Sequence, residues 1–527
     1  MKRLNKFSNI KYLVLPVVLL LLFTCSCTKQ LNYTPEVFLS AQQIYADQVG
    51  ATAGITGIYQ QLQTLKKSDY ALIGIIGTDE ARCAYQNQGY GAYYAGITGL
   101  DVYDLTFNSQ NADISGYWSV CYKGIANANA ALENIPAINN FADVTVKNRL
   151  MGEASFLRAL FYFQLVQLYG DIPMPLQKTS FTDGIPRTPV SDVYKQIIID
   201  LKYAATNLWI KSKNPDAGRA SMEAAKALLG KVYLTIHDYP NAKTTFEDLL
   251  TNSNLILLPK YSDLFKIENN AESLFEIQYS QESGNTNNLA NYFGCSAGAV
   301  VPGGPTPTNA TPGYGGNVVI STKYYSDSVF APTDTRFASS ITPHYYANIL
   351  LSSNYYWWID IGLPHINKYD ILSSGSTNAS SSTKNMYYLR SADVYLMYAE
   401  VLNELGQTTA ALQPLNAVRN RAALPNIEVA LGKTPSQTEL RIELMVERTR
   451  ELGGEGWRWF DLKRTGTLVN SVMAHNNPKL YYMTKNHTTV DAHPAQNVSD
   501  KNNLYPIPLA ELQNNPALSL TSQNPGY

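Results

Sequence analysis

The feature that constrains this fold most is a fixed spacing of small and large residues near the middle of the chain. Leu229 and Gly230 are followed by Tyr233, and after a short gap come Ala242 and Phe246. Apolar residues at three- and four-residue spacings indicate helices. Small residues let two helices approach, and large residues fill the seam between them. The spacing therefore predicts two helices packed closely as a hairpin.

This spacing matches the tetratricopeptide repeat, in which Leu-Gly and Tyr on one helix precede Ala and Phe on the next. A weaker copy in the same register has Tyr398, Ala399 and Leu402, followed by Ala411 and Leu415. The alternative is that both are ordinary helical hairpins. The copies are not contiguous, so a regular solenoid is not expected. Either interpretation predicts a helical scaffold of the kind that presents ligands or partners.

The wider pattern predicts a mainly α fold. Apolar residues recur at helical spacing from 147 to 169, and Gly170 and Pro173 follow as stop signals. Helices are expected at residues 42–65, 147–169, 191–208, 221–235, 241–250, 387–405, 408–422 and 436–452, with Ser191 as an N-cap and an extended piece at 274–279. The helical scaffold then covers about 40–66, 147–280 and 387–466, and the tail at 467–527 is expected to be mostly irregular.

Two loop-rich segments interrupt this scaffold, at about 69–122 and 281–384. The first is rich in Gly and Tyr and the second in Gly, Pro, Ser, Thr and Asn, a composition that marks loops. An insertion of this length inside a compact chain is usually functional or disordered, and its many aromatic residues argue against plain disorder. Tyrosine (37) outnumbers phenylalanine (16), and its amphipathic ring suits a half-wet surface. The two segments are therefore expected to form a variable ligand face.

Charge and cysteine content exclude several kinds of site. The chain has 41 basic and 42 acidic residues, so nucleic acid is not an expected partner. Beyond residue 27 only Cys83, Cys121 and Cys295 remain, which allows at most one disulfide and offers no Cys-x-x-Cys spacing. The histidines are scattered. No metal site and no cofactor are therefore expected.

The N-terminus indicates export. A basic head, with Lys2 and Arg3 at its start, precedes an apolar run at 13–23. The run is shorter than the roughly 20 residues of a spanning helix, so the two features predict a secretory signal. The run ends in Cys25-Ser26-Cys27, which resembles a bacterial lipobox. We expect a lipoprotein signal peptide at 1–26 and a single domain at 27–527, anchored by acyl chains such as palmitate on Cys27. The alternatives are lipidation of Cys25 and a plain cleaved signal.

Several motifs along the chain together resemble the SusD/RagB family of Bacteroidetes outer-membrane lipoproteins. In chain order they are LNYTP at 31–35, GEASFLRA at 152–159, LYGDIP at 168–173, RT at 187–188, GRA at 218–220, LRSADV at 389–394, MYAE at 397–400, NELG at 403–406, ERTREL at 447–452, EGWRWFDL at 455–462, YPIP at 505–508 and QNPGY at 523–527. Each motif alone is weak, but the ordered set covers the chain nearly end to end.

This resemblance implies both a fold and a function. It implies a SusD-like α/α scaffold with tetratricopeptide-like hairpins and a variable loop-rich face. It implies a protein anchored by lipid to the outer membrane and facing the exterior, with a SusC-like TonB-dependent transporter as partner. Members of the family most often bind glycans, and a RagB-like minority serves peptide uptake. The chain is accordingly expected to capture a glycan, with a peptide as the alternative ligand, and to catalyse nothing.

Candidate ligand-binding residues come from two sources. The turn from Asp79 to Arg82 resembles the acidic turn near the ligand face of the family. A helix cap or plain turn is the alternative role for Asp79. Aromatic residues in the loop-rich segments can stack on the apolar face of a sugar, which removes both surfaces from water. The full set of candidates is Asp79, Arg82, Tyr85, Tyr90, Tyr93, Tyr292, Tyr314 and Trp357.

The sequence gives little support for a catalytic site. Residues 294–298 match the Gly-x-Ser-x-Gly elbow of hydrolases around Ser296, but that motif needs a following helix, and here a Gly/Pro loop follows. Charged residues at 447–451 suggest a structural ion-pair network, with Arg448 one turn from Glu451. Trp457 and Trp459 are expected in the core. A secreted hydrolase therefore remains only a distant alternative.

Overall fold

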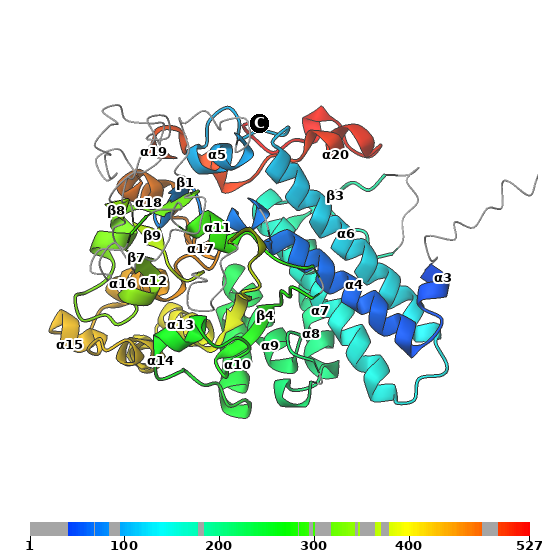
Figure 1. Cartoon of the computed structure of the whole chain (residues 1–527), viewed down its shortest axis with the longest axis horizontal. Coiled ribbons are helices and arrows are strands. Elements are labelled where there is room, and N and C mark those ends of the chain that lie inside the picture. The colour runs from blue at the N-terminus through cyan, green and yellow to red at the C-terminus, as the bar shows by residue number, and fades with distance from the viewer. Residues whose placement is uncertain are drawn as a thin grey trace, which may run out of the picture.

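The computed structural model describes residues 41–67, 69–83, 95–177, 184–214, 216–282, 284–294, 299–300, 318–342, 346–347, 364–369, 379–476 and 494–527. Across these residues the fold is mainly helical, with a few short strands, as the sequence predicts (Figure 1). Within the same residues, no helix combines the length and apolarity that crossing a membrane requires.

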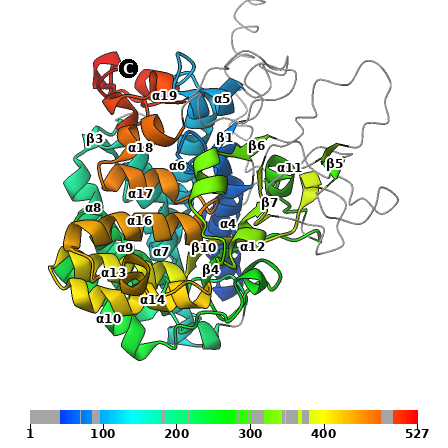
Figure 2. The same ribbon diagram turned by 90° about the vertical axis from the view of Figure 1, so that its left-hand side faces the viewer.

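The scaffold is a series of long helices in which each packs on its neighbour (Figures 1 and 2). Its members are α4 (Gln48–Lys66), α6 (Ala112–Asn134), α7 (Val144–Tyr169), α8 (Val190–Asn207), α9 (Met222–Thr235), α10 (Tyr239–Asn252), α13 (Ser391–Glu404), α14 (Thr408–Arg421) and α16 (Gln437–Leu452). Shorter helices follow α16 or connect the series: α3 (Ala41–Ile44), α5 (Ala95–Val102), α11 (Leu289–Phe293), α12 (Phe337–Ser340), α15 (Ile427–Leu431), α17 (Arg458–Arg464), α18 (Leu468–His475), α19 (Pro494–Asn497) and α20 (Leu509–Asn514).

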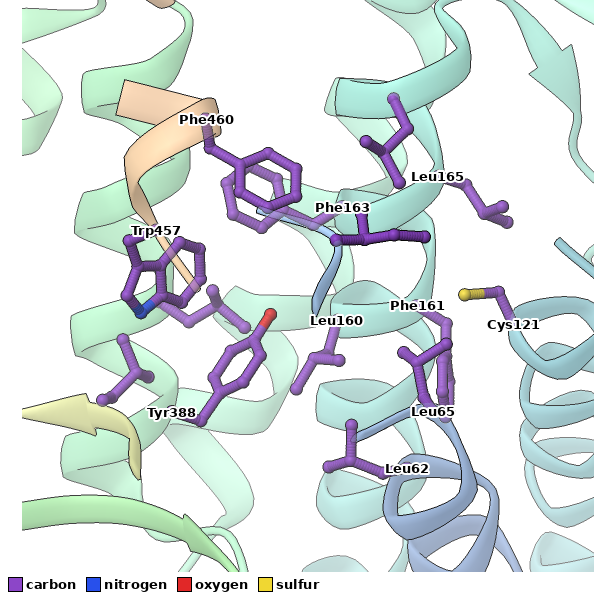
Figure 3. Close-up of a cluster of buried hydrophobic side chains, with 14 of the residues drawn as sticks. Leu62, Leu65, Cys121, Leu160, Phe161, Phe163, Leu165, Tyr388, Trp457 and Phe460 are labelled. Carbon is purple, nitrogen blue, oxygen red and sulfur yellow. The ribbon is translucent and has the colours of Figure 1, made fainter. Parts of the chain in front are cut away.

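The hydrophobic core surrounds α7, whose residues from Gly152 to Tyr169 are all buried. Figure 3 shows side chains of α4, α6 and α7 meeting the rings of Tyr388, Trp457 and Phe460. Trp457 and Trp459 are buried, which confirms their expected place in the core. The helix ends at Gly170, whose φ of 73° is one that glycine adopts without steric conflict.

The predicted helical hairpins are confirmed. Gly230 of α9 faces Phe246 of α10 so closely that a Cβ atom at position 230 would lie 2.3 Å from the phenylalanine ring. This contact is the physical reason for the small-then-large spacing. In the second copy, Ala399 and Leu402 of α13 share one buried cluster with residues of α14, including Ala411. The two hairpins are neighbours in space because α10 packs on α13.

Some predicted boundaries are wrong. Ser191 is not an N-cap, because α8 begins at Val190, whose amide donates to the Asp171 carboxylate at 2.9 Å. The first expected helix is split into α3 and α4, and Asp47 caps α4 by accepting from the Gly50 amide. Residues 387–390, expected to be helical, belong instead to strand β10 (Met386–Arg390), which pairs antiparallel with β4 (Ser273–Ile277).

Two regions expected to be irregular are more ordered than predicted. Helix α6 begins at Ala112, inside the loop-rich segment, and packs between α4 and α7. The tail contains α18, α19 and α20, and it also closes the end of α7. The Tyr505 amide donates to the carbonyl of Leu168 at 2.7 Å, and the Asn524 side chain donates to that of Tyr169 at 2.9 Å. These bonds satisfy carbonyls that a helix end leaves without partners.

Candidate ligand-binding site

The described ends of the variable segments meet on a small set of paired strands, called here the loop platform. Strand β1 (Ala81–Cys83) pairs with β6 (Val319–Ser321), and β7 (Ile341–Thr342) pairs with β9 (His365–Ile366). The Ser321 amide donates to the Pro364 carbonyl at 3.0 Å, which joins the two pairs. A further pair, within the second variable segment, is β5 (Ala299–Val300) with β8 (Tyr346–Ala347). The pair of β2 (Ile172–Pro173) with β3 (Arg187–Thr188) follows α7 and is not part of the loop platform.

The loop platform gathers chain ends that are far apart in sequence. The chain leaves β1 at Cys83 and reaches β6 at Val319 only after the scaffold helices from α6 to α10, and it leaves β7 at Thr342 and reaches β9 at His365. Figure 2 shows β1, β6 and β7 with α11 on one side of the molecule, away from α8 and α9. The loop platform is therefore the place where described ends of both variable segments meet.

Five of the predicted ligand residues lie outside the described residues: Tyr85, Tyr90, Tyr93, Tyr314 and Trp357. Only their order in the chain relates them to the strands of the loop platform. The first three follow strand β1, Tyr314 precedes β6, and Trp357 precedes β9. The proposed lipidation site Cys27 and the motif residue Ser296 also lie outside the described residues. The roles predicted for these residues stay predictions.

Asp79 lies in the interior of the protein beneath the loop platform. Its two carboxylate oxygens accept from the Arg458 guanidinium at 2.7 and 2.6 Å, and Ser471 donates to the second at 2.6 Å. Burial alone would raise the pKa of Asp79, but the Arg458 charge outweighs it and holds that pKa below its ordinary value. The carboxylate thus joins the platform to α17 and α18, and a ligand would have to break this ion pair to reach it.

Glu80 is also buried, but in a different electrostatic setting. Its carboxylate accepts from the Gly454 amide at 3.2 Å, and its backbone carbonyl accepts from the Thr322 amide at 3.1 Å. Burial raises the pKa of Glu80 to about 8. Arg82, the third polar residue of this turn, lies in β1 opposite Ile320 and is buried too. The predicted acidic turn therefore forms the base of the face in this structure.

Tyr292 of α11 is at the edge of the loop platform and is buried. Its hydroxyl donates to the carboxylate of Asp69 in the short helix η1 (Asp69–Leu72), and its carbonyl accepts from the Val318 amide at 3.1 Å. Nearby, burial together with the Asp69 carboxylate raises the pKa of Asp113 to about 7. The structure thus brings Tyr292 close to the root of the segment that holds Tyr314, with its hydroxyl already bonded.

A pair of stacked rings near the platform was missed by sequence reasoning. Tyr324, in the π-helical turn η6 (Tyr324–Ser328), stacks on His475 of α18 with ring centroids 3.9 Å apart. Both residues are partly exposed. Tyr324 is visible in the sequence as one more aromatic of the variable segment. Its partner lies in a distant helix, so no local pattern could indicate the stack.

The predicted ion-pair network is confirmed, with different partners from those expected. Arg448 pairs with Asp393 and Asp461 rather than with Glu451. Glu451 instead accepts hydrogen bonds from three arginines. Arg336 lies in the variable segment, Arg390 in β10 and Arg421 in α14.

This network fixes the variable segment to the scaffold. Arg336, which is fully buried, also pairs with Glu447 of α16 at 2.7 Å. Lys368, next to strand β9, pairs with Glu455 at 2.8 Å. Buried ion pairs with several hydrogen bonds are strongly destabilised when one partner is removed. The variable segment is therefore attached at two points by charges that lie in the protein interior.

The described residues give little support for a metal site or for a cysteine nucleophile. Across those residues, no group of three His, Cys, Asp or Glu side chains is placed to hold a metal ion. Cys121 is a buried free thiol, and burial raises its pKa, so it is a core residue and not a nucleophile.

Two family models match this chain over different parts. A model described as "SusD family" matches residues 271–527. A second, described as "Starch-binding associating with outer membrane", matches residues 75–234. Together they cover both the helical scaffold and the loop platform.

Individual relatives match over nearly the whole chain. SusD-like protein P2 of Formosa agariphila is 29% identical, and the alignment covers 98% of this chain and 100% of the relative. A solved structure described as a laminarin binding SusD-like protein is 25% identical, with a TM-score of 0.73, covering 92% of this chain and all of that one. A SusD homologue from Bacteroides thetaiotaomicron, at 23% identity, has a TM-score of 0.74 over 96% of this chain and 100% of its own. These matches confirm the predicted helical fold class.

Proposed function

The chain belongs to the SusD/RagB family, and from this premise we propose that it is a glycan-binding lipoprotein of the outer membrane. It captures an oligosaccharide or polysaccharide and passes it to a SusC-like TonB-dependent transporter. The observation that carries the proposal is the convergence of the variable segments on the loop platform. The predicted ligand residues Tyr85, Tyr90, Tyr93, Tyr314 and Trp357 belong to the segments that precede or follow these strands in the chain, which supports the proposal.

Physical reasoning favours a sugar over a charged ligand at such a face. The flat side of a sugar ring is apolar and its edge is hydroxylated, so aromatic rings can cover the first while their polar tips reach the second. The platform's own charges, including Asp79 with Arg458, are paired in the interior and are not displayed to a ligand. The laminarin binding relative has the same fold at 25% identity. These observations support a glycan ahead of a peptide.

The same reasoning assigns no chemical step to this protein. Binding by stacking and hydroxyl hydrogen bonds needs no nucleophile and no acid–base pair. The buried carboxylates Asp79 and Glu80 are adjacent in the chain, whereas glycoside hydrolysis requires two carboxyls about 5–9 Å apart across a cleft. Replacing Ser296 by Ala should leave any glycan turnover unchanged, and loss of a measurable hydrolysis would revive the hydrolase alternative.

The anchor is proposed to be Cys27, exposed as the first residue of the mature chain after removal of residues 1–26. Metabolic labelling of the full-length protein with palmitate should give a labelled band that Cys27→Ser removes. The matched control is Cys25→Ser, which should keep the label. Label retained in Cys27→Ser and lost in Cys25→Ser would move the anchor to Cys25.

Affinity electrophoresis tests the ligand class and the face together. The protein truncated after Cys27 is run through gels that contain laminarin, other neutral polysaccharides or none. Retardation in one glycan gel, weakened in Tyr90→Ala and Trp357→Ala, is the expected result. Tyr203→Ala is the control, because Tyr203 is a partly buried ring on α8, away from the loop platform. Equal weakening by the control would contradict the proposed face.

A further inference from the structure

A second feature of the surface is a cavity of about 410 Å³ among the scaffold helices. It lies where the turn between α9 and α10 meets the end of α13 and the helices α16, α17 and α18. These last three pack on one another in chain order (Figure 2). Of the predicted ligand residues that the structure describes, namely Asp79, Arg82 and Tyr292, none lines it. Its volume falls within the range of about 300–1,000 Å³ typical of small-molecule sites.

One wall of the cavity is apolar and accessible to solvent. Ile442, Met445 and Val446 of α16 line it, together with Leu462 of α17. Ile442 is 61% exposed, so part of this wall is open to solvent. A ligand with an apolar face would remove this surface from water, which is favourable.

Aromatic rings from two other elements border the same cavity. Tyr324 is held in place by its stack on His475. His237 has a φ of 61°, a left-handed conformation that few non-glycine residues adopt. Its ring stacks on Tyr239, with centroids 5.7 Å apart, and its Nε2 lies 3.1 Å from the Arg464 carbonyl oxygen. The cavity is therefore bordered by Tyr324, which His475 holds in place, and by the stacked rings of His237 and Tyr239.

The charges around the cavity are balanced pair by pair. Arg441 binds both carboxylate oxygens of Glu404, at 2.6 and 2.8 Å, and Arg464 binds Glu400 in the same bidentate way. Arg458 is held by Asp79 and the Met445 carbonyl. Arg464 also binds Asp461, so each nitrogen of these two buried guanidiniums is already bonded. Arg441 is largely exposed and bonds Glu404 through two of its three nitrogens, so it keeps N–H donors for a ligand.

From this geometry we infer that the cavity is a second binding site, for a short neutral oligosaccharide. Apolar and aromatic walls match the flat side of a sugar ring, and the exposed Arg441–Glu404 pair together with the Thr465 and Thr467 hydroxyls matches its hydroxyls. An anionic ligand would find no unpaired cation among these lining residues, and burying its charge without a partner is unfavourable. The inference rests on the proposed function, because it takes the ligand to be of the same class.

Three variants separate the cavity from the rest of the molecule. Ile442→Glu places a charge on its apolar wall, and Tyr324→Ala removes a ring; each should weaken sugar binding at the cavity by about tenfold. The matched control is Ile199→Glu on α8. Ile199 is an isoleucine with 59% exposure, close to that of Ile442, and it does not line the cavity. The control should change the affinity less than about twofold.

The test uses the methyl signal of Met445, which lines the cavity, in methionine-labelled protein followed by NMR. Met445→Leu assigns the signal. Maltohexaose, laminarihexaose and cellohexaose are titrated, with an oligogalacturonate and a peptide digest alongside, and calorimetry on the same samples records total binding. A saturable Met445 shift with a neutral oligosaccharide, weakened by Ile442→Glu and Tyr324→Ala but not by Ile199→Glu, is the expected result.

The other outcomes overturn the inference in distinguishable ways. Calorimetric binding of a neutral sugar with no Met445 shift would remove the second site and leave the proposed function standing. A shift with only the anionic sugar or only peptides would show that the cavity takes another ligand class. Absence of both sugar binding and any Met445 shift would overturn the inference and the proposed function together.

Discussion

Two neighbouring carboxyl groups at the base of the loop platform, those of Asp79 and Glu80, differ in charge because their surroundings differ. Asp79 lies against Arg458, which keeps its pKa below the ordinary value although burial acts in the other direction. Glu80, one residue on, is more strongly influenced by burial, and its pKa is raised to about 8. Near neutral pH one side chain is therefore ionised and the other largely protonated. The Arg458 charge stabilises the ionised form of Asp79, and burial favours the protonated form of Glu80.

The Glu80 carboxyl should make stability depend on pH in a defined direction. Because its pKa in the folded protein is raised, its contribution is complete below about pH 4.5 and is lost as the pH rises toward 8. Glu80→Gln keeps an acceptor for the Gly454 amide but cannot ionise. In denaturant titrations the variant should lie within about 1 kcal/mol of the wild type at pH 5 and exceed its unfolding free energy by about 4 kcal/mol at pH 9, because one pKa unit corresponds to about 1.4 kcal/mol.

A surface substitution provides the comparison for this prediction. Glu282 is exposed, so Glu282→Gln should change the unfolding free energy by less than about 0.5 kcal/mol at both pH values. If Glu80→Gln were less stable than the wild type at pH 9, the assignment of a buried, protonated Glu80 would be wrong.

At the scale of elements, the packed hairpins follow from sequence because their determinants are local. The Gly230–Phe246 contact is encoded by residues that lie a short distance apart in the chain. Strand β10 was mistaken for helix because its partner β4 is more than a hundred residues earlier, so no local pattern distinguishes the two. Helix α6 was missed because its first turns hold residues of low helix propensity such as Gly116, and packing on α4 and α7 overrides that preference.

The sequence likewise predicts only part of the candidate site. Composition alone indicates that aromatic residues gather in the variable segments. It cannot indicate that Asp79 is interior, because its partner Arg458 is 379 residues further along the chain. Nor can it show that Tyr324 meets His475. Contacts between distant segments arise only when the scaffold has brought them together.

The hairpin contact can be tested with two glycines in different surroundings. Alanine favours helix over glycine by about 1 kcal/mol. Gly230→Ala should nevertheless destabilise the protein by about 1–3 kcal/mol, because the new methyl group collides with Phe246. Gly57→Ala in α4, where a Cβ atom meets nothing within 4 Å, should stabilise it by about 0.5–1 kcal/mol. Guanidinium midpoints give both values, and a destabilised Gly57→Ala together with a neutral Gly230→Ala would refute the account of this spacing.

At the scale of the whole molecule, a rigid helical scaffold carries a variable face attached through buried charges. Arg336 reaches from the variable segment to Glu447 and Glu451 of α16, and Lys368 reaches Glu455. The ion pairs between these residues and the scaffold keep the described parts of the variable segment in place.

Removing one of these ion pairs should increase local unfolding in the variable segment more than in the helical scaffold. Arg336→Met leaves Asp334 and part of the network without a partner and should cost about 3 kcal/mol. Hydrogen exchange should speed up in β6 and α12 more than in α9. Arg441→Met, which removes an ion pair of a largely exposed arginine, should cost less than about 1 kcal/mol. Equal loss of protection in α9 and α12 would argue against a separate attachment.

The proposed glycan binding at the loop platform is tested most directly by calorimetric titration of the protein truncated after Cys27 with laminarin, other neutral polysaccharides and peptide digests. We expect saturable binding to at least one glycan, weakened about tenfold or more by Tyr90→Ala or Trp357→Ala. Saturable binding to peptides alone, with every glycan silent, would contradict the proposed glycan binding.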